Sequence, residues 1–291
     1  KTGLDESVIT GEGLMHGRRV AVVACEFRFL AGSIGVASEM HCGSGVIASP
    51  TETVFGSSPR AITRDLDWGV PIPVEGYAEH LMRKEKITRQ EYLGLAQRFN
   101  PTEFDAEEWV LTAKNTGMRY FIVTAKHHDG FAMYDSEISD FDIIDQTPFR
   151  SDPMAELAAA CRKHDMKFGF YYSHAFDWEH PDAPGNDWEY RNPGGDLHLY
   201  GGRNWYDAHP ELLPKAIRYL DEKSIPQIKE LIHKYHPDIL WFDTPHKIPL
   251  SENIRILKEI RAADPDIVVN GRLARTGSIS FGDYKNTSDR P

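Results

Sequence analysis

A single aspartate at the end of an apolar segment is the first candidate for chemistry in this sequence. Asp243 directly follows Trp241 and Phe242, at the end of the segment DILWFD that starts at Asp238. A carboxylate at the end of a buried strand is held rigidly toward a pocket, as a glycosidase nucleophile or a metal ligand requires. The plainer alternative is an aspartate that caps the loop after the strand.

Two adjacent histidines form the second candidate. His127 and His128 precede Asp129 and Gly130, directly after the apolar segment YFIVTAK. Imidazole rings at a strand end hydrogen-bond substrate hydroxyls or bind a metal, and the alternative is a pair of satisfied, partly buried histidines. Arg272 ends the segment DIVVNGR and is able to orient a carboxylate through its forked donors, although a lone arginine there is more often a surface charge.

These candidates all follow segments that read as buried strands, with helical patterns between them. The continuous apolar runs are 120–126, 167–173, 238–243 and 266–272. The residues expected to cap the intervening helices are Asp105, Asp152 followed by Pro153, Ser224 and Ser251.

Alternating buried strands and helices predict parallel βα units, in a doubly wound sheet or a barrel. No glycine-rich phosphate turn follows any of these strands, which removes the main support for a nucleotide-binding sheet. The polar candidates instead gather where strands end, the face on which barrel enzymes build their sites. We therefore expect an α/β fold, a (β/α)8 TIM-like barrel that is incomplete, with an atypical N-terminal region.

Composition excludes several classes of function. The chain has 291 residues, with 33 Lys plus Arg against 44 Asp plus Glu, and a formal net charge of -11. No basic run is present for nucleic acid, and no stretch of about 18 apolar residues is present to span a membrane. Cys25, Cys42 and Cys161 lie far apart, so they predict neither a disulfide framework nor a cysteine-rich zinc site.

The long stretch between Ser173 and Lys223 is rich in aromatic residues among Gly, Pro, Asn and Asp. These aromatic residues are Trp178, Trp188, Tyr190, Tyr200, Trp205 and Tyr206. A loop of this length in a compact domain is usually functional, and we expect it to stack on sugar faces or to form a lid.

Longer motifs carry a resemblance to a known family. They are TAKHHDGFAMYDS (124–136), TPFRSDPMAELAAACRKHDMKFGFYYS (147–173), FDWEHP (176–181), KYHPDILWFD (234–243), VVNGR (268–272) and GDYKNTSDRP (282–291). In this order and spacing they closely resemble the family 29 glycoside hydrolases, the α-L-fucosidases, over about residues 77–291.

The resemblance implies retaining hydrolysis of terminal α-L-fucosyl linkages, in which Asp243 forms a covalent glycosyl-enzyme. It also implies a fucoside or fucosylated glycan as substrate, and neither a metal nor another cofactor. It places the general acid/base beyond residue 291, with Asp289 as a weak candidate in the final segment. The implied substrate-binding residues are His127, His128, Tyr171, Trp241 and Arg272.

Within that set the resemblance implies distinct roles. The two histidines hold sugar hydroxyls, Tyr171 lies near the nucleophile, and Trp241 walls the apolar pocket for the fucose methyl group. The same resemblance suggests a periplasmic or extracellular location, although the first residues lack the apolar core of a secretory signal. Oligomeric state is left open.

The N-terminal segment, residues 1–76, resembles other families in pieces. Residues 8–38 are similar to an acyl-CoA carboxyltransferase, 43–56 to the threonylcarbamoyl-AMP synthases and 58–73 to methionyl-tRNA synthetase. We therefore expect a composite segment over 1–76 before a truncated fucosidase-like catalytic barrel over 77–291. The segment 19–24 reads as a strand that would fill the first place in the barrel.

Two other functions remain open from the sequence. One is a metal-dependent barrel hydrolase with His127, His128 and Asp243 as ligands, for which His174 and His246 are further candidates. The other is a chain that binds fucosyl glycans without catalysis, or an inactive composite.

Overall fold

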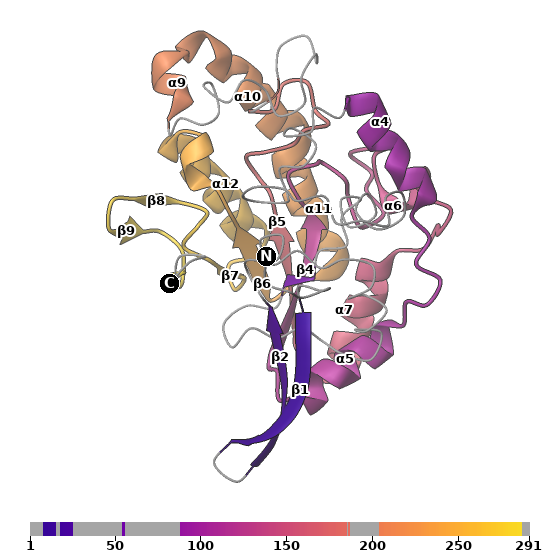
Figure 1. Ribbon diagram of the computed structural model, residues 1–291. Helices are drawn as coiled ribbons and strands as arrows, with labels where there is room; N and C mark the ends of the chain where they lie inside the picture. The colour runs from indigo at the N-terminus through magenta and orange to yellow at the C-terminus, as the bar shows by residue number, and fades with distance from the viewer. Residues whose placement is uncertain are drawn as a thin grey trace, which may run out of the picture.

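The computed structural model describes residues 8–15, 18–25, 54–55, 88–184, 186 and 204–286 (Figure 1). Its strands are β1 (Val8–Met15), β2 (Arg18–Cys25), β3 (Val54–Phe55), β4 (Tyr120–Lys126), β5 (Lys167–Tyr172), β6 (Ile239–Phe242), β7 (Val268–Val269), β8 (Arg275–Thr276) and β9 (Ile279–Ser280). Its α-helices are α4 (Arg89–Gly94), α5 (Ala106–Asn115), α6 (Ile143–Gln146), α7 (Pro153–Lys163), α9 (Trp205–Ala208), α10 (Leu213–Tyr219), α11 (Ile225–Tyr235) and α12 (Leu250–Ala263). Shorter helical turns are η3 (Leu95–Arg98), η4 (Pro210–Leu212), η6 (Pro245–Lys247) and the π-helical turn η5 (Leu220–Ser224).

Five strands form one parallel sheet in the order β3-β4-β5-β6-β7, which is also their order along the chain. A doubly wound sheet reverses its strand order at a switch point, whereas in a barrel each strand pairs with the next strand of the chain. The predicted α/β fold with parallel strands is therefore confirmed. These five strands contain no such switch point.

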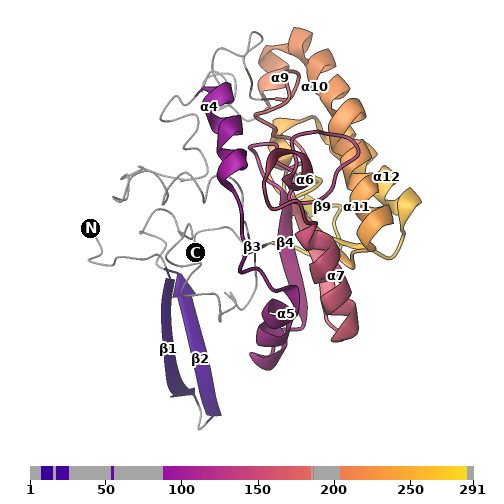
Figure 2. The ribbon, with the colours of Figure 1, turned by 90° about the vertical axis from the view of Figure 1, so that its right-hand side faces the viewer.

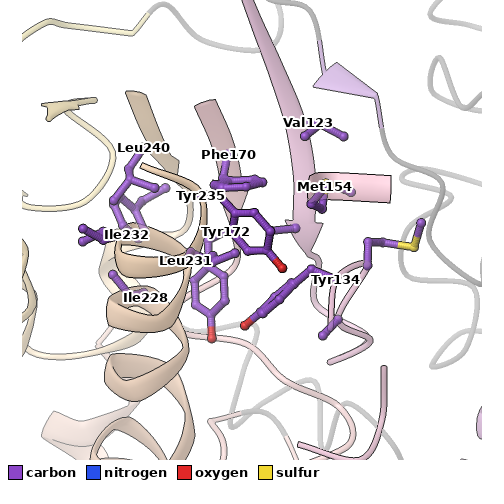
Figure 3. Close-up of a cluster of buried hydrophobic side chains, with 14 of the residues drawn as sticks. Val123, Tyr134, Met154, Phe170, Tyr172, Ile228, Leu231, Ile232, Tyr235 and Leu240 are labelled. Atoms are coloured by element: carbon purple, nitrogen blue, oxygen red, sulfur yellow. The ribbon is translucent and has the colours of Figure 1, made fainter. Parts of the chain in front are cut away.

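One face of the sheet packs against helices. Because consecutive strand residues point to opposite faces, alternate side chains of β4, β5 and β6 share this face. Figure 3 shows Phe170 and Leu240 near Ile232 and Leu231 of α11, and Val123 near Met154 of α7, and all of them belong to the main hydrophobic core. This burial is the main stabilising contribution to the fold.

The opposite face carries a smaller buried cluster. Ile122, Tyr171 and Trp241 come from three neighbouring strands, with Tyr171 and Trp241 in register. Gly169 leaves room on this face, because a Cβ there would lie 2.6 Å from the Ile239 carbonyl oxygen. In a barrel this is the face that points inward, toward the axis.

The helices follow one another around the sheet. Helix α5 packs on α7, α7 on α11, and α11 on α12, and Figure 2 shows α7, α11 and α12 together on one side of β4. The predicted caps of the first two are confirmed: Asp105 accepts from the backbone N–H of Glu108, and Asp152 caps α7 ahead of Pro153.

The predicted caps at Ser224 and Ser251 are wrong. Ser224 has helical backbone angles inside a helical run that continues from α10 through η5 into α11. Its hydroxyl donates to the His174 carbonyl at 2.9 Å, so a partner distant in sequence uses the group expected to cap. Ser251 lies inside α12, whose N-cap residue is Pro249.

The stretch 173–223 is also more regular than expected. Residues 205–219 contain α9, η4 and α10, and η5 follows directly. A single structureless loop over this stretch is therefore the wrong description. No helix among the described residues is both long enough and apolar enough to cross a membrane.

The N-terminal strands form a separate sheet. Strand β2 pairs antiparallel with β1, from Val8 opposite Cys25 to Met15 opposite Arg18. The segment 19–24 is a strand as predicted, but it does not take the first place in the parallel sheet. Beside β4 that place belongs to β3, at Val54 and Phe55.

Candidate active site

The sequence candidates follow four neighbouring strands and meet at one edge of the sheet. His127 and His128 follow β4, Tyr171 lies near the end of β5, and Asp243 follows β6. Arg272 comes three residues after the end of β7. Because the carboxyl ends of parallel strands share one edge, side chains distant in sequence lie in one place.

Asp243 is held by two donors on the same carboxylate oxygen. Its Oδ1 accepts from the backbone N–H of Thr244 at 2.7 Å and from Nη1 of Arg272 at 3.4 Å. Thr244 has a φ of 54°, a left-handed conformation that non-glycine residues rarely adopt. These two contacts fix one carboxylate oxygen of Asp243 beside the Arg272 guanidinium.

Asn270 supports this arrangement from the neighbouring strand. Its side-chain Oδ1 accepts from the backbone N–H of Phe242 at 2.8 Å, and its Nδ2 donates to the Phe242 carbonyl at 2.9 Å. The fully buried amide thus continues the pairing between β6 and β7 by one residue, directly before Asp243. Asn270 lies in the segment DIVVNGR, in which only Arg272 was a sequence candidate.

An aromatic wall lies beside the carboxylate. Trp241 and Tyr171 are almost fully buried in one cluster, and Tyr284 meets Trp241 edge-on with ring centroids 6.2 Å apart. The ring of His127 stacks on Tyr171, with centroids 5.0 Å apart and planes 8° from parallel. The edge therefore combines an apolar surface with polar groups, as sugar recognition requires.

The two histidines are fixed differently. His127 accepts from the backbone N–H of His128 at Nδ1, at 2.8 Å. His128 is buried, with its Nδ1 2.6 Å from the hydroxyl of Ser173 and its carbonyl accepting from the backbone N–H of Trp178 at 2.7 Å. The segment after β5 thus braces the turn after β4.

Behind the histidines lies a buried group of charges that sequence reasoning missed. Asp177 accepts from Lys126 at 3.1 Å and from Lys223 at 2.9 Å, and Lys223 also pairs with Glu179 at 2.9 Å. The side chains of Lys126 and Asp177 have no solvent exposure. The available signal was a lysine at the end of an apolar strand, where an unpaired charge is not tolerated.

Burial and pairing act on these groups in opposite directions. Burial lowers the pKa of Lys126 to about 8, against the attraction of Asp177. Burial alone would raise the pKa of Asp177, but Lys126 and Lys223 hold it well below its ordinary value. Asp177 therefore stays charged and anchors the segment that carries Trp178.

The metal hypothesis finds no support among the described residues, where no group of three or more histidine, cysteine, aspartate and glutamate side chains is arranged to hold an ion. His174 is fully buried and shares a hydrogen bond of 3.0 Å with Asn253. Burial lowers the pKa of His174 to about 4, and its ring meets Phe242 edge-on. This histidine belongs to the protein core.

Two of the aromatic residues expected to stack on sugars are buried instead. Trp178 packs against Tyr92, and Trp205 donates from Nε1 to the Lys247 carbonyl at 2.9 Å. Tyr206, in α9, is partly buried and donates to Oδ1 of Asn204 at 3.1 Å. Trp188, Tyr190 and Tyr200, like the weak candidate Asp289, lie outside the described residues.

Comparison with known proteins gives a consistent family. A family model described as Alpha-L-fucosidase matches residues 65–290. The tissue alpha-L-fucosidase of Rattus norvegicus is 29% identical over 205 residues, and that of Homo sapiens is 27% identical over 205 residues. Each match covers 68% of this chain and 39% of the relative, so the chain spans well under half the length of these curated relatives.

Solved structures agree. Alpha-L-fucosidase AlfC from Lactobacillus casei in complex with its alpha-L-fucose product is 34% identical with a TM-score of 0.62, covering 76% of this chain and 66% of that one. The alpha-L-fucosidase from Vibrio sp. strain EJY3 is 33% identical with a TM-score of 0.60, covering 76% and 36%. The three resemblances within 8–73 and the domain boundary after residue 76 stay predictions.

Proposed function

Because this chain belongs to the α-L-fucosidase family, we propose that it hydrolyses terminal α-L-fucosyl linkages with retention and that Asp243 is its nucleophile. The observation that carries the proposal is the position of the Asp243 carboxylate, held by Arg272 at the edge where His127 and Tyr171 also lie. The proposed architecture is a (β/α)8 barrel in which β3 to β7 form part of the wall. A periplasmic or extracellular location is proposed on the family resemblance alone.

The reaction needs two displacements at the anomeric carbon. In the first, a carboxylate oxygen of Asp243 bonds to that carbon while the bond to the leaving oxygen breaks, and a second carboxyl group protonates the leaving oxygen. In the second, water attacks the same carbon, the second carboxylate takes the water proton, and the ester bond to Asp243 breaks. Two inversions give net retention and return both carboxyl groups to their starting states.

The remaining candidates are proposed to bind the sugar. His127 and His128 hold hydroxyl groups, and Arg272 orients the nucleophile through the 3.4 Å contact. Tyr171 lies beside the reacting centre, and Trp241 offers an apolar surface to the fucose methyl group. A pocket wall of aromatic rings with a few fixed polar groups suits a deoxy sugar, which presents both a methyl group and hydroxyls.

Covalent labelling tests the nucleophile directly. A 2-deoxy-2-fluoro-fucosyl donor with an activated leaving group needs little protonation, so the identity of the general acid does not affect the result. We expect one fucosyl label per chain on the peptide that contains Asp243, and an unlabelled Asp243→Ala variant. A label on another carboxylate would reassign the nucleophile.

Hydrolysis of an aryl α-L-fucoside, with the first-formed anomer read by NMR, tests the reaction itself. The α anomer of fucose is expected from the wild-type protein, and equal rates for wild type and Asp243→Ala would contradict catalysis by this residue. Binding of fucose without labelling or turnover would overturn the enzymatic proposal in favour of glycan binding.

A further inference from the structure

One buried hydroxyl lies between a candidate sugar-binding histidine and a main-chain carbonyl. Ser173 is fully buried at the end of β5. Its Oγ lies 2.6 Å from Nδ1 of His128 and 3.1 Å from the carbonyl oxygen of Phe176. Both contacts are hydrogen-bond distances, so the hydroxyl takes part in two bonds with one proton to give.

The proton count assigns the direction of both bonds. A carbonyl oxygen only accepts, so the Ser173 hydroxyl must donate its single hydrogen to Phe176 for that contact to be a bond. The serine oxygen then accepts from His128, whose Nδ1 must carry a hydrogen. A neutral imidazole has one ring proton, so Nε2 of His128 carries a lone pair instead.

We propose that Ser173 is a positioning residue that fixes His128 in the Nδ1-protonated tautomer, which makes Nε2 a hydrogen-bond acceptor rather than a donor. The effect on fucoside kinetics that follows from the tautomer rests on the proposed function. The tautomer itself is a property of the protein without sugar. Ser173 acts through His128 and does not touch the substrate.

The surroundings hold all three groups in place. The Phe176 carbonyl also accepts from Nζ of the buried Lys126 at 3.1 Å, which fixes the acceptor that orients the serine. The His128 ring meets Phe176 edge-on at 5.0 Å and Trp178 at 5.8 Å between centroids. Turning the ring over would break these packing contacts together with the bond to Ser173.

Nuclear magnetic resonance of the ligand-free protein tests the tautomer. Long-range proton–nitrogen spectra of protein labelled with 15N-histidine, recorded near pH 8, separate protonated from unprotonated ring nitrogens. A His128→Gln variant assigns the signals. We expect His128 with a protonated Nδ1 and an unprotonated Nε2. A protonated Nε2 in the wild-type protein would overturn the proposal without any variant.

The Ser173→Ala variant tests whether the serine causes the tautomer. We expect its His128 to shift toward the Nε2-protonated form, and KM for an aryl fucoside to rise roughly tenfold with a smaller change in kcat. Ser173→Thr, which keeps the hydroxyl, should restore the Nδ1-protonated form. An unchanged tautomer in Ser173→Ala would overturn the role of Ser173.

A matched control lies one residue earlier. Tyr172→Phe removes a buried hydroxyl that contacts Gln227 at 2.8 Å on the helix side of the same strand. It should leave both the tautomer and KM unchanged, and a shift equal to that of Ser173→Ala would contradict the proposal. If wild-type protein shows the expected tautomer but no turnover, the proposed function fails while the tautomer assignment stands.

Discussion

Both ends of strand β6 carry an aspartate, and the two aspartates stand in different surroundings. Asp238, at the amino end, accepts from Lys167 at 2.6 Å and from the backbone N–H of Phe168 at 3.0 Å. The Lys167 side chain is 69% exposed. Asp243, at the carboxyl end, meets Arg272, whose side chain is only 12% exposed. Asp238 therefore lies at a solvent-exposed edge of the sheet, whereas Asp243 follows the strand that carries the buried ring of Trp241.

Polar side chains that follow the neighbouring strands are also buried at the carboxyl edge of the sheet. At the carboxyl edge Lys126, His128, His174 and Asn270 are all 4% exposed or less. Desolvating such groups costs free energy that apolar residues of the same size would not cost. The carboxyl edge therefore positions buried polar groups, whereas Lys167 and Asp238 at the amino edge stay exposed to solvent.

Removal of the Asp243 carboxylate should give the largest effect. For Asp243→Ala we expect kcat for an aryl fucoside to fall roughly 10³-fold or more, because the covalent intermediate cannot form. Thermal stability should change little, since the side chain is partly exposed. Added azide should restore turnover and give the β-fucosyl azide by a single inversion. Loss of activity without any azide product would point to a structural role.

Breaking the buried charge group should give the next largest effect, on stability. In Asp177→Asn, the buried Lys126 loses the carboxylate that neutralises it, and Lys223 keeps only its pair with Glu179. We expect the free energy of unfolding in urea to fall by about 3–5 kcal/mol. The control is Asp182→Asn, which disturbs a more exposed pair with Arg218 and should cost no more than about 1 kcal/mol. Equal losses of stability in Asp177→Asn and Asp182→Asn would contradict the contrast between buried and exposed charges.

The buried His174 predicts a dependence of stability on pH. Burial lowers its pKa to about 4 from an ordinary value of 6.5. At a pH above both pKa values the ring is neutral in the folded and unfolded states, so it adds no pH dependence to the free energy of unfolding. Between them the unfolded chain binds a proton that the folded protein does not, so the free energy of unfolding falls as the pH falls. The loss reaches about 2 kcal/mol near pH 5 and is complete below the folded pKa.

Comparison with a variant isolates that contribution from other titrating groups. Urea unfolding of wild type and His174→Gln is measured near pH 7.5 and near pH 5. On going from pH 7.5 to pH 5, the free energy of unfolding of the wild type should fall by about 2 kcal/mol more than that of His174→Gln. Parallel curves for His174→Gln would rule out the expected linkage.

Local sequence signals predicted most of the elements that build the site. Strand β4 spans 120–126 as expected, because an apolar run of only 7 residues is too short for a helix and typical of a buried strand. Helix α7 begins after Asp152, where a cap and a first-turn proline agree. The contact between Asp243 and Arg272 follows from topology, because parallel strands end at the same edge. The catalytic and binding roles of these residues stay predictions.

Signals that depend on distant partners were missed. Ser224 looks like a cap, but the His174 carbonyl takes its hydroxyl inside a continuous helix. Lys126 and Asp177 are 51 positions apart, and although the apolar run before Lys126 signals a buried charge, nothing near it identifies Asp177 as the partner. Pairing between segments that meet only in the folded protein decides their burial, and no local pattern encodes it.

The smallest effect should come from the amino edge, where Asp238→Asn removes the ion pair with Lys167. An asparagine oxygen can still accept from the Phe168 N–H, so only the exposed charge interaction is lost. Exposed pairs contribute little, and we expect a melting temperature within about 3 °C of wild type with unchanged kcat and KM. The measurement is thermal unfolding at low and high salt beside fucoside kinetics. A large loss of activity in Asp238→Asn would show that the amino edge shares in catalysis, which the contrast between the two ends of β6 forbids.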